Sequence, residues 1–386
     1  MLHPQSLSVE SKESVDLGVP VPARTPYLIL DIGRVVASYH RLKSALPIDR
    51  VHYALKCNPA PDVMRAIADA GGSFDVSSLA ELRSVAEIGA DTRDVLFSHP
   101  VKRPADIAAA HAAEVAAFAF DSSDEVDKIA RYAPGSSVYV RLSAPPAASK
   151  VPSEGTFGVG VEAAVTLLQR AAAAGLDPCG LGFHVGSQMV DVRAWPHAIS
   201  MAGEVVRRAA AVGIDLRMLD IGGGFPVRYE EPVPDIEEIA KQIEDALDDV
   251  PGDLRVLAEP GRYLAAEAGE LVATVIGVSD MAGRRRVTID AGVFHGLAEA
   301  LETDGRLPFP VTDSRRDPQK VTCKLVGPTC DSMDVVRVSV SLSAGLRAGD
   351  TIRIHCAGAY TWSCIKDFNG FSMPSLHLGE VSGWEC

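Results

Sequence analysis

Between residues 51 and 262 the chain alternates short apolar, β-branched runs with longer stretches rich in alanine and leucine. The short runs are typical of buried strands, and the longer stretches have the apolar spacing of helices. The predicted strands span residues 51–56, 73–76, 95–98, 115–121, 138–142, 180–184, 217–221 and 254–259. The helices between them are predicted to begin near Pro61, Leu79, Pro104, Ser122, Val161, Val192 and Pro234.

Eight strands that alternate with helices indicate a (β/α)8 barrel, preceded by one helix over residues 33–45. A doubly wound open sheet is the alternative that the same alternation allows. Beyond Arg262 the helical stretches give way to alternating or β-branched runs, so we expect a second, mostly β domain. Its predicted strands span residues 271–278, 286–289, 321–326, 335–340 and 350–356.

The predicted domain division follows from this change of pattern. Residues 33–268 form the barrel, and residues 1–32 together with 269–386 form the β-rich domain, which the extended stretch 25–30 joins from the N-terminus. Residues 306–320 are rich in proline, arginine and aspartate, which predicts a surface loop.

Composition restricts the possible partners. The chain has 386 residues, with 37 lysines and arginines against 51 aspartates and glutamates, a formal net charge of −14. Binding to nucleic acid or to an anionic membrane surface requires a basic surface, so we expect neither, whereas a cationic small substrate suits this field. No apolar run reaches the ~18 residues that a membrane span needs, and the N-terminus lacks the pattern of a signal peptide. Seven scattered cysteines without a C-x-x-C pair argue against a zinc ribbon or a disulfide framework, so we expect a metal-free cytoplasmic protein.

Polar residues gather where the predicted barrel strands end, which is where barrel enzymes carry their chemistry. Strict alternation along V-H-Y-A-L-K places His52, Ala54 and Lys56 on one face. If that face lines the barrel, Lys56 stands at its mouth, where a desolvated lysine can form a Schiff base. A solvated loop lysine is the alternative.

Two glycine segments suggest a phosphate site. Gly222, Gly223 and Gly224 follow one predicted strand, and Gly261 with Arg262 follows the next. Glycines let backbone N–H groups approach an anion, and arginine offers a bidentate fork. The loops after strands seven and eight are the usual phosphate site of such barrels, although two ordinary glycine turns would look the same. The chain has neither a G-x-x-x-x-G-K-[ST] segment nor a G-x-G-x-x-G helix start, so the lysine and the phosphate cradle together indicate pyridoxal 5′-phosphate.

Other single residues allow both a functional and a structural interpretation. His184 could stack on a cofactor ring or be a satisfied histidine at a strand end. Glu259 could pair with a ring nitrogen or form a salt bridge to Arg262. Cys330 could donate a proton or be a small buried hydrophobe. Tyr360 would ordinarily be half-buried packing with a hydrogen-bonded hydroxyl.

Together, in this order from Tyr27 to Phe371, the motifs resemble the fold-type III pyridoxal-phosphate decarboxylases, which act on ornithine, lysine, arginine or diaminopimelate. Y-A-L-K-C-N resembles the strand of the cofactor lysine, which implies that Lys56 holds the cofactor. F-D-V-S-S implies that Asp75 lies near the cofactor. H-V-G-S-Q implies a ring-stacking His184 and a phosphate ligand in Ser187.

The same resemblance assigns the phosphate and ring contacts. L-D-I-G-G-G-F-P resembles the family's phosphate loop, with Gly223 in the loop and Gly224 as the direct contact. E-P-G-R implies a pyridine-nitrogen carboxylate in Glu259. The further phosphate contacts that the resemblance implies are Gly261, Arg262 and Tyr360.

G-P-T-C-D-S-M-D resembles the segment that enters the partner subunit's active site. It implies a homodimer with shared sites, in which Cys330 is the proton donor and Asp331 a substrate ligand. G-G-G-F-P, T-C-D and F-N-G-F are most similar to the ornithine/lysine branch. Glu302 stands where similar bacterial members carry an aspartate for the distal ammonium, so we expect it to bind the substrate and to favour a shorter side chain. The alternative is that its helix is displaced, which would cancel the longer reach, or that Glu302 points to solvent.

The resemblance implies decarboxylation of a basic L-amino acid, of ornithine or lysine type, to an amine such as putrescine or cadaverine. A decarboxylase of a modified or shorter diamino acid in siderophore or antibiotic assembly is one alternative. Diaminopimelate decarboxylase is another, although no arginine follows the D-A-G of residues 290–292. A racemase would carry arginine in place of Glu259, and a non-catalytic regulatory homologue would not need Lys56 and Cys330.

Overall fold

A computed structural model describes residues 24–145, 149–151, 155–281, 283–302 and 307–382. The N-terminal segment considered above for targeting and Cys386 lie outside these residues. Eight parallel strands close into a barrel in the order β10-β11-β2-β3-β4-β5-β6-β8, which confirms the predicted fold and excludes the open sheet. The barrel strands are β2 (Arg50–Ala54), β3 (Ser73–Val76), β4 (Leu96–Phe97), β5 (Ala117–Phe120), β6 (Ser137–Leu142), β8 (Asp177–Phe183), β10 (Met218–Asp220) and β11 (Arg255–Ala258).

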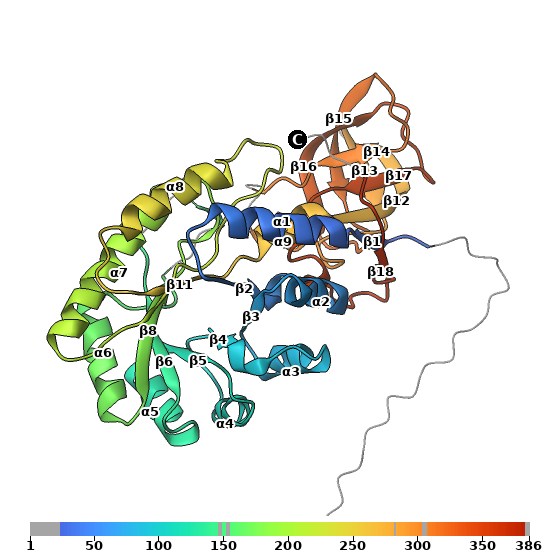
Figure 1. Cartoon of the computed structure of the whole chain (residues 1–386). Coiled ribbons are helices and arrows are strands. Elements are labelled where there is room, and N and C mark those ends of the chain that lie inside the picture. Colours follow the sequence, from blue (N-terminus) through green and yellow to red (C-terminus); the bar gives the residue numbers. More distant parts are fainter. Residues whose placement is uncertain (1–23, 146–148, 152–154, 282, 303–306, 383–386) are drawn as a thin grey trace, which may run out of the picture.

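Helices surround the barrel (Figure 1). They are α1 (Ile32–Ala45), α2 (Pro61–Asp69), α3 (Leu79–Glu87), α4 (Pro104–Ala112), α5 (Ser123–Tyr132), α6 (Val161–Ala173), α7 (Ala194–Ala211) and α8 (Ile236–Leu247). Their starts follow local capping chemistry: the side chains of Asp31, Ser78 and Ser122 each accept a backbone N–H from the first turn of the following helix. Proline occupies the first position of α2 and α4. Within the described residues, no helix combines the length and the apolar content needed to cross a bilayer.

The second domain is a mixed eight-stranded sheet with the path β14-β17-β12-β13-β15-β16. Strand β1 pairs with both β12 and β18, so the N-terminal stretch does join this domain as predicted. Its strands are β1 (Tyr27–Leu30), β12 (Gly269–Met281), β13 (Arg284–Ile289), β14 (Val311–Asp313), β15 (Lys320–Val326), β16 (Val335–Ser343), β17 (Thr351–Ile354) and β18 (Ser375–Leu378).

One local prediction was wrong, and one small sheet was not predicted. The predicted loop 306–320 contains strand β14, because the buried carboxylate of Asp313 accepts backbone N–H groups from Arg315, Arg316 and Ser343 and so ties the segment to the sheet. The polar composition of this segment therefore reflects turn capping. A two-stranded sheet of β7 (Ser149–Val151) and β9 (Ser187–Met189) was also missed, because three-residue strands carry almost no periodic signal.

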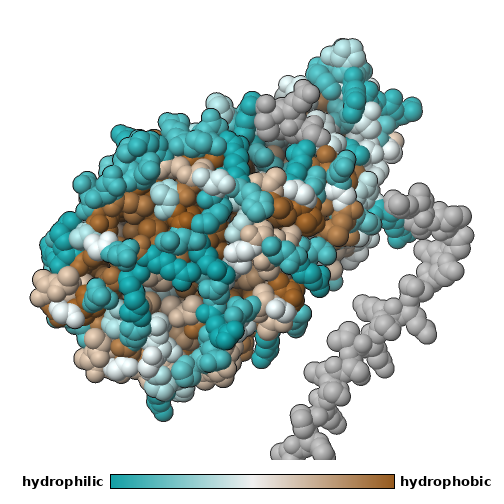
Figure 2. Space-filling model, in the orientation of Figure 1, coloured by the Kyte–Doolittle hydropathy of each residue, from teal (hydrophilic) through white to brown (hydrophobic). Residues whose placement is uncertain are grey.

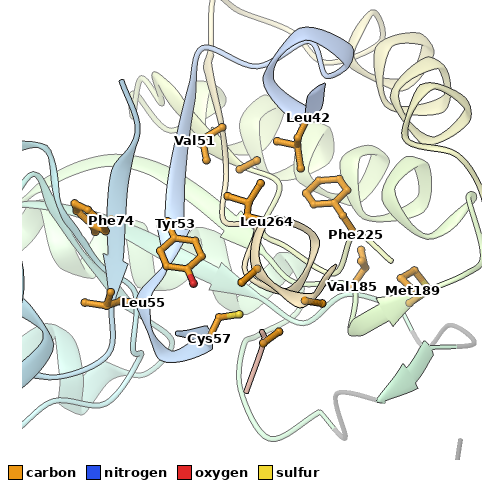
Figure 3. Packing of buried hydrophobic residues seen from close by; sticks show 14 of the residues in the cluster. Leu42, Val51, Tyr53, Leu55, Cys57, Phe74, Val185, Met189, Phe225 and Leu264 are labelled. Carbon is orange, nitrogen blue, oxygen red and sulfur yellow. The ribbon is translucent and has the colours of Figure 1, made fainter. Parts of the chain in front are cut away.

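The hydrophobic core runs through both domains. Figure 3 shows side chains from several elements meeting in it, among them Leu42 of α1, Val51 of β2 and Leu264 of the short helix α9 (Arg262–Ala265). On the face shown in Figure 2, hydrophilic residues cover most of the periphery and hydrophobic residues lie in the hollows between them. The core thus fixes the β domain against the barrel beside the carboxyl-terminal ends of its strands.

Candidate active site

A cavity of about 150 Å³ opens where the barrel strands end, and residues from many strands line it. Of the residues predicted for the site, the cavity brings together Lys56, Asp75, His184, Ser187, Gly224, Glu259, Gly261, Arg262 and Tyr360. The first eight come from the barrel, and the last comes from the β domain. The predicted cluster at the strand ends therefore exists as one site.

Lys56 lies in the cavity wall, but not on a strand. Strand β2 ends at Ala54, and residues Leu55–Cys57 form a 3-10 turn, so strict alternation extended one step too far. Backbone bonds hold this turn: the Ala54 N–H bonds Pro260 O at 3.1 Å, and the Tyr360 N–H bonds Cys57 O at 2.8 Å. Leu55 and Cys57 are completely buried while Lys56 is exposed, so the turn directs its amine into the cavity.

Glu259 directly follows β11 and is held in a buried hydrogen-bond chain. The Ser98 hydroxyl donates to Glu259 Oε1 at 2.5 Å, and the Tyr139 hydroxyl donates to Ser98 Oγ at 2.8 Å. The salt bridge to Arg262, which was the structural interpretation of Glu259, is not formed among the described ion pairs. Ser98 stood among the polar strand-end residues of the sequence, but neither it nor Tyr139 had been given a role.

Two further carboxyl groups face Glu259. Burial, followed by the charge of Glu259, raises the pKa of Asp75 to about 7, although Lys56 opposes this shift. The same two causes raise the pKa of Asp220 well above its ordinary value. Asp220 accepts the Gly222 N–H at 2.8 Å through Oδ1. In the part of the chain that the structure describes, Asp75 Oδ1 and Asp220 Oδ2 are buried with no hydrogen-bond partner.

His184 follows β8 and lines the cavity. Burial first, and then the charges of Arg141 and Lys56, lower its pKa to about 3. The imidazole is therefore neutral at physiological pH. A neutral aromatic ring in the wall suits stacking against a flat cationic ring, because it adds no repulsion.

The glycine loop after β10 packs so closely against neighbouring backbone that it leaves no room for side chains. A Cβ on Gly222, Gly223 or Gly224 would lie 2.1, 2.4 or 2.4 Å from a backbone carbonyl oxygen. Gly222 and Gly224 also have φ values of +66° and +100°, which only glycine adopts readily. Gly224 lines the cavity, whereas Gly223 packs against the Glu259 carbonyl behind it.

Arg262 is buried and already carries partners. Its guanidinium binds both oxygens of Glu299, and it donates to the Tyr229 hydroxyl at 2.8 Å and to Ser187 Oγ at 3.1 Å. The ring of Tyr360 lies 5.0 Å from its Cζ. Glu299, from the short helix α10 (Glu299–Glu302), was not predicted as a site residue.

Tyr360 reaches the barrel because the β-domain chain crosses α9 closely. A Cβ on Gly358 would lie 1.8 Å from Ala265 O, so only glycine permits this approach. The Asn58 amide donates to Gly358 O at 2.8 Å and secures the crossing.

Like Gly223, Cys330 and Asp331 do not line this cavity. Cys330 and Asp331 lie in the turn between β15 and β16, and Cys330 is exposed, so its interpretation as a buried hydrophobe was wrong. Glu302 ends α10, but its side chain lies outside the described residues.

The remaining residues fit pyridoxal 5′-phosphate. This group presents an aldehyde, a phosphate and a pyridine nitrogen, and the cavity supplies an amine, a glycine cradle and a buried carboxylate for them. The unused acceptor at Asp75 Oδ1 leaves capacity for a further polar contact.

The chain matches the family described as "Pyridoxal-dependent decarboxylase, pyridoxal binding domain" over residues 32–266. It is 32% identical to the lysine/ornithine decarboxylase of Selenomonas ruminantium over 377 residues, which covers 97% of this chain and 94% of that protein. It is also 32% identical to antizyme inhibitor 2 of Xenopus laevis, with 92% and 81% covered. A solved structure of lysine/ornithine decarboxylase from Vibrio vulnificus, complexed with putrescine, superposes with a TM-score of 0.84 at 33% identity, covering 92% of this chain and 94% of that one.

Proposed function

The chain belongs to the pyridoxal-dependent decarboxylase family, and we propose from this premise that it decarboxylates a basic L-amino acid of ornithine or lysine type. The observation that carries the proposal is the single cavity that Lys56, Glu259 and the glycine cradle share. The names of the relatives, lysine/ornithine decarboxylase among them, support the substrate class. The net charge of −14 favours cationic substrates.

Each part of the cavity has one task in binding the cofactor. Lys56 supplies the amine for the aldehyde, and His184 supplies a neutral face for the ring. Backbone N–H groups of the glycine loop and of Gly261 bind the phosphate together with Ser187, Arg262 and Tyr360. Because Glu299 already pairs with Arg262, the guanidinium is fixed in place before the phosphate arrives.

When bound, pyridoxal phosphate supplies a ring that accepts the electron pair left behind as CO2 departs. Glu259, as a carboxylate, holds a proton on the ring nitrogen and thereby makes that acceptance favourable. Cys330 of a second subunit then delivers a proton to the substrate Cα. Because the pKa values of Asp75 and Asp220 are raised, these two carboxyl groups place less negative charge beside Glu259.

The proposed assembly is a homodimer with shared sites. Cys330 and Asp331 lie outside the cavity of their own chain, in an exposed turn of the β domain. Three large apolar side chains are exposed: Met333 in the same turn, and Phe371 and Met373 farther along the chain. Burial of these exposed apolar side chains against a second copy of the chain would favour the proposed homodimer.

The remaining parts of the proposal are the domain division and the location. Residues 33–268 would be the cofactor-binding barrel, and the rest would be the domain that supplies Cys330 and Asp331. A cytoplasmic location is supported by the free thiols of Cys57, Cys179 and Cys323.

A substrate panel tests this function. Purified protein with pyridoxal phosphate is incubated with ornithine, lysine, arginine, diaminobutyrate and diaminopimelate, and the products are identified by mass. We expect putrescine or cadaverine as the main product, and no product from Lys56→Ala. Preferred turnover of diaminopimelate would contradict the branch assignment.

Because the chain is also similar to antizyme inhibitor 2, the experiment must distinguish an active decarboxylase from a protein that binds the cofactor without turnover. If the protein bound the cofactor but turned over no amino acid in the panel, the proposed activity would be wrong. Borohydride reduction and peptide mapping then report whether Lys56 carries the cofactor. Labelling of another lysine would contradict its assignment.

A further inference from the structure

The Tyr139–Ser98–Glu259 chain connects three barrel strands that are not neighbours in the sequence. Ser98 follows β4, Tyr139 lies in β6 and Glu259 follows β11. Tyr139 is completely buried, and Ser98 and Glu259 are only 8% and 7% exposed. At this depth a hydrogen bond to a charged acceptor is strong, because little water competes for it.

The direction of the two hydrogen bonds matters. Tyr139 donates to Ser98 Oγ, so the serine hydroxyl hydrogen is left to donate to Glu259 Oε1. One hydroxyl donating to the next strengthens the second bond. The backbone fixes both ends of this contact: Ser98 N–H bonds Val76 O at 3.1 Å, and Glu259 N–H bonds Gly222 O at 2.8 Å.

Ser98 binds only one of the two carboxylate oxygens. The hydrogen bond from Ser98 reaches Oε1, and the buried carboxyl group of Asp220 lies beside Glu259 as a further hydrogen-bonding group. A carboxylate anchored through one oxygen keeps the other available in a set direction. Since Glu259 lines the cavity, we take its second oxygen, Oε2, as the one that meets a bound group.

We propose that Ser98 is a positioning residue that orients the Glu259 carboxylate toward the ring nitrogen of pyridoxal phosphate, with Tyr139 holding the Ser98 hydroxyl in its donating direction. This inference rests on the proposed function, because it takes Glu259 as the partner of the ring nitrogen. Ser98 itself acts through Glu259 and need not touch the ring nitrogen.

Two carboxyl groups also surround Glu259. Asp75 and Asp220 approach from β3 and β10, and both would repel an ionised Glu259 unless protonated. Among the described residues, Ser98 is the side chain whose hydroxyl donates directly to Glu259.

A cofactor analogue isolates this role. Protein stripped of cofactor is titrated with pyridoxal phosphate and with 1-deazapyridoxal phosphate, in which C–H replaces the ring nitrogen, and the two dissociation constants are measured. In Ser98→Ala we expect the constant for pyridoxal phosphate to rise about 10- to 100-fold, as for a lost hydrogen bond to a charged group. The constant for the deaza analogue should change less than about 2-fold, because that ligand makes no ring-nitrogen contact.

Two more variants test whether the effect depends on the Ser98 hydroxyl group. Ser98→Thr keeps the hydroxyl and should restore the preference for pyridoxal phosphate over the analogue, even if its methyl group weakens both ligands. Tyr139→Phe should reduce that preference less than Ser98→Ala does. The double variant should show no more loss than Ser98→Ala alone, because both act through one chain.

Ser73→Ala is the matched control. Ser73 is also a buried barrel serine, whose hydroxyl donates to Asp94 O at 2.7 Å at the other end of β3. It should leave the ratio of the two dissociation constants unchanged. Equal weakening of both ligands in Ser98→Ala, or no weakening of either, would overturn the positioning role.

The proposed function fails separately, if the unmodified protein does not bind pyridoxal phosphate or does not prefer it to the analogue. As a further readout, kcat of Ser98→Ala at saturating cofactor should fall more than KM rises. A change in KM alone would contradict an effect transmitted through Glu259.

Discussion

At the scale of single residues, the site depends on charges placed where water cannot screen them. Asp75 is 2% exposed, one of its oxygens has no partner among the described residues, and Glu259 faces it. Such a carboxyl group favours its protonated form until a cation or a ligand compensates it. The folded protein therefore binds a proton here that the unfolded chain releases at lower pH.

This difference predicts a dependence of stability on pH in the cofactor-free protein. The pKa of Asp75 is raised from 3.8 to about 7. The stabilisation that protonated Asp75 gives to the folded state is fully present below pH ~4. It is lost as the pH rises to ~7, because over this range the folded state binds more protons than the unfolded state. Asp75→Asn should remove a decline of about 2–4 kcal/mol in the free energy of unfolding between these limits.

Urea unfolding of both proteins at pH 5 and pH 8 measures this difference. Asp69→Asn, at an exposed position at the end of α2, is the control and should follow the unmodified protein. An identical pH dependence in Asp75→Asn and in the unmodified protein would refute the prediction.

At the scale of elements, short connections decide what the cavity can hold. The loop after β10 passes so close to the ends of β8 and β11 that three consecutive positions have no room for a Cβ. The turn after β2 similarly exposes Lys56 between two buried neighbours. These connections are rigid because backbone contacts, rather than side chains, define them.

Gly224→Ala should therefore impair both folding and cofactor binding. The new Cβ would lie 2.4 Å from Gly186 O at a φ of +100°, so the loop must move. We expect a loss of about 1–3 kcal/mol in stability and at least ~10-fold weaker binding of pyridoxal phosphate. Thermal unfolding and cofactor titration measure the two effects.

Gly277→Ala is the matched control, since no heavy atom lies within 4 Å of its added Cβ and its φ is ordinary. It should leave both quantities nearly unchanged. Normal cofactor binding by Gly224→Ala would argue against the glycine loop as the phosphate site.

At the scale of the whole molecule, the barrel and the β domain divide the chemistry. The barrel carries Lys56 and Glu259, while Cys330 and Asp331 lie in a turn of the other domain and do not line this cavity. In the proposed assembly a second copy of the chain would supply these two residues, and a symmetric dimer would complete two sites at once.

Mixing Lys56→Ala protein with Cys330→Ala protein tests this arrangement. Each variant alone should have little activity, but a heterodimer contains one intact site. Random exchange in an equal mixture should restore about a quarter of the unmodified activity, because half of the dimers are mixed and each has one site of two. If differently tagged subunits exchange in a pull-down and activity does not return, the site is not shared.

The amino-acid sequence by itself was sufficient for the barrel, for the β domain and for most cavity residues. The spacing of apolar residues shows which positions of a strand or helix are buried. The eight strand–helix repeats could therefore be predicted without knowing which strands pair. Lys56, His184 and Glu259 were found for a related reason: each stands within a few residues of a strand end, and parallel barrel strands all end at the same mouth.

Only the tertiary structure decided which side chains act on one another. Ser98 and Glu259 are 161 residues apart, and Ser98 and Tyr139 are 41 apart, yet barrel closure brings them into hydrogen-bond contact. Arg262 likewise binds Glu299, although Glu259 is much nearer to it in the sequence. Periodicity tells which positions are buried but not which distant positions face each other, because that depends on how the strands tilt and close. The hydrogen-bond partners of Glu259 and Arg262 are therefore decided by the closure of the barrel.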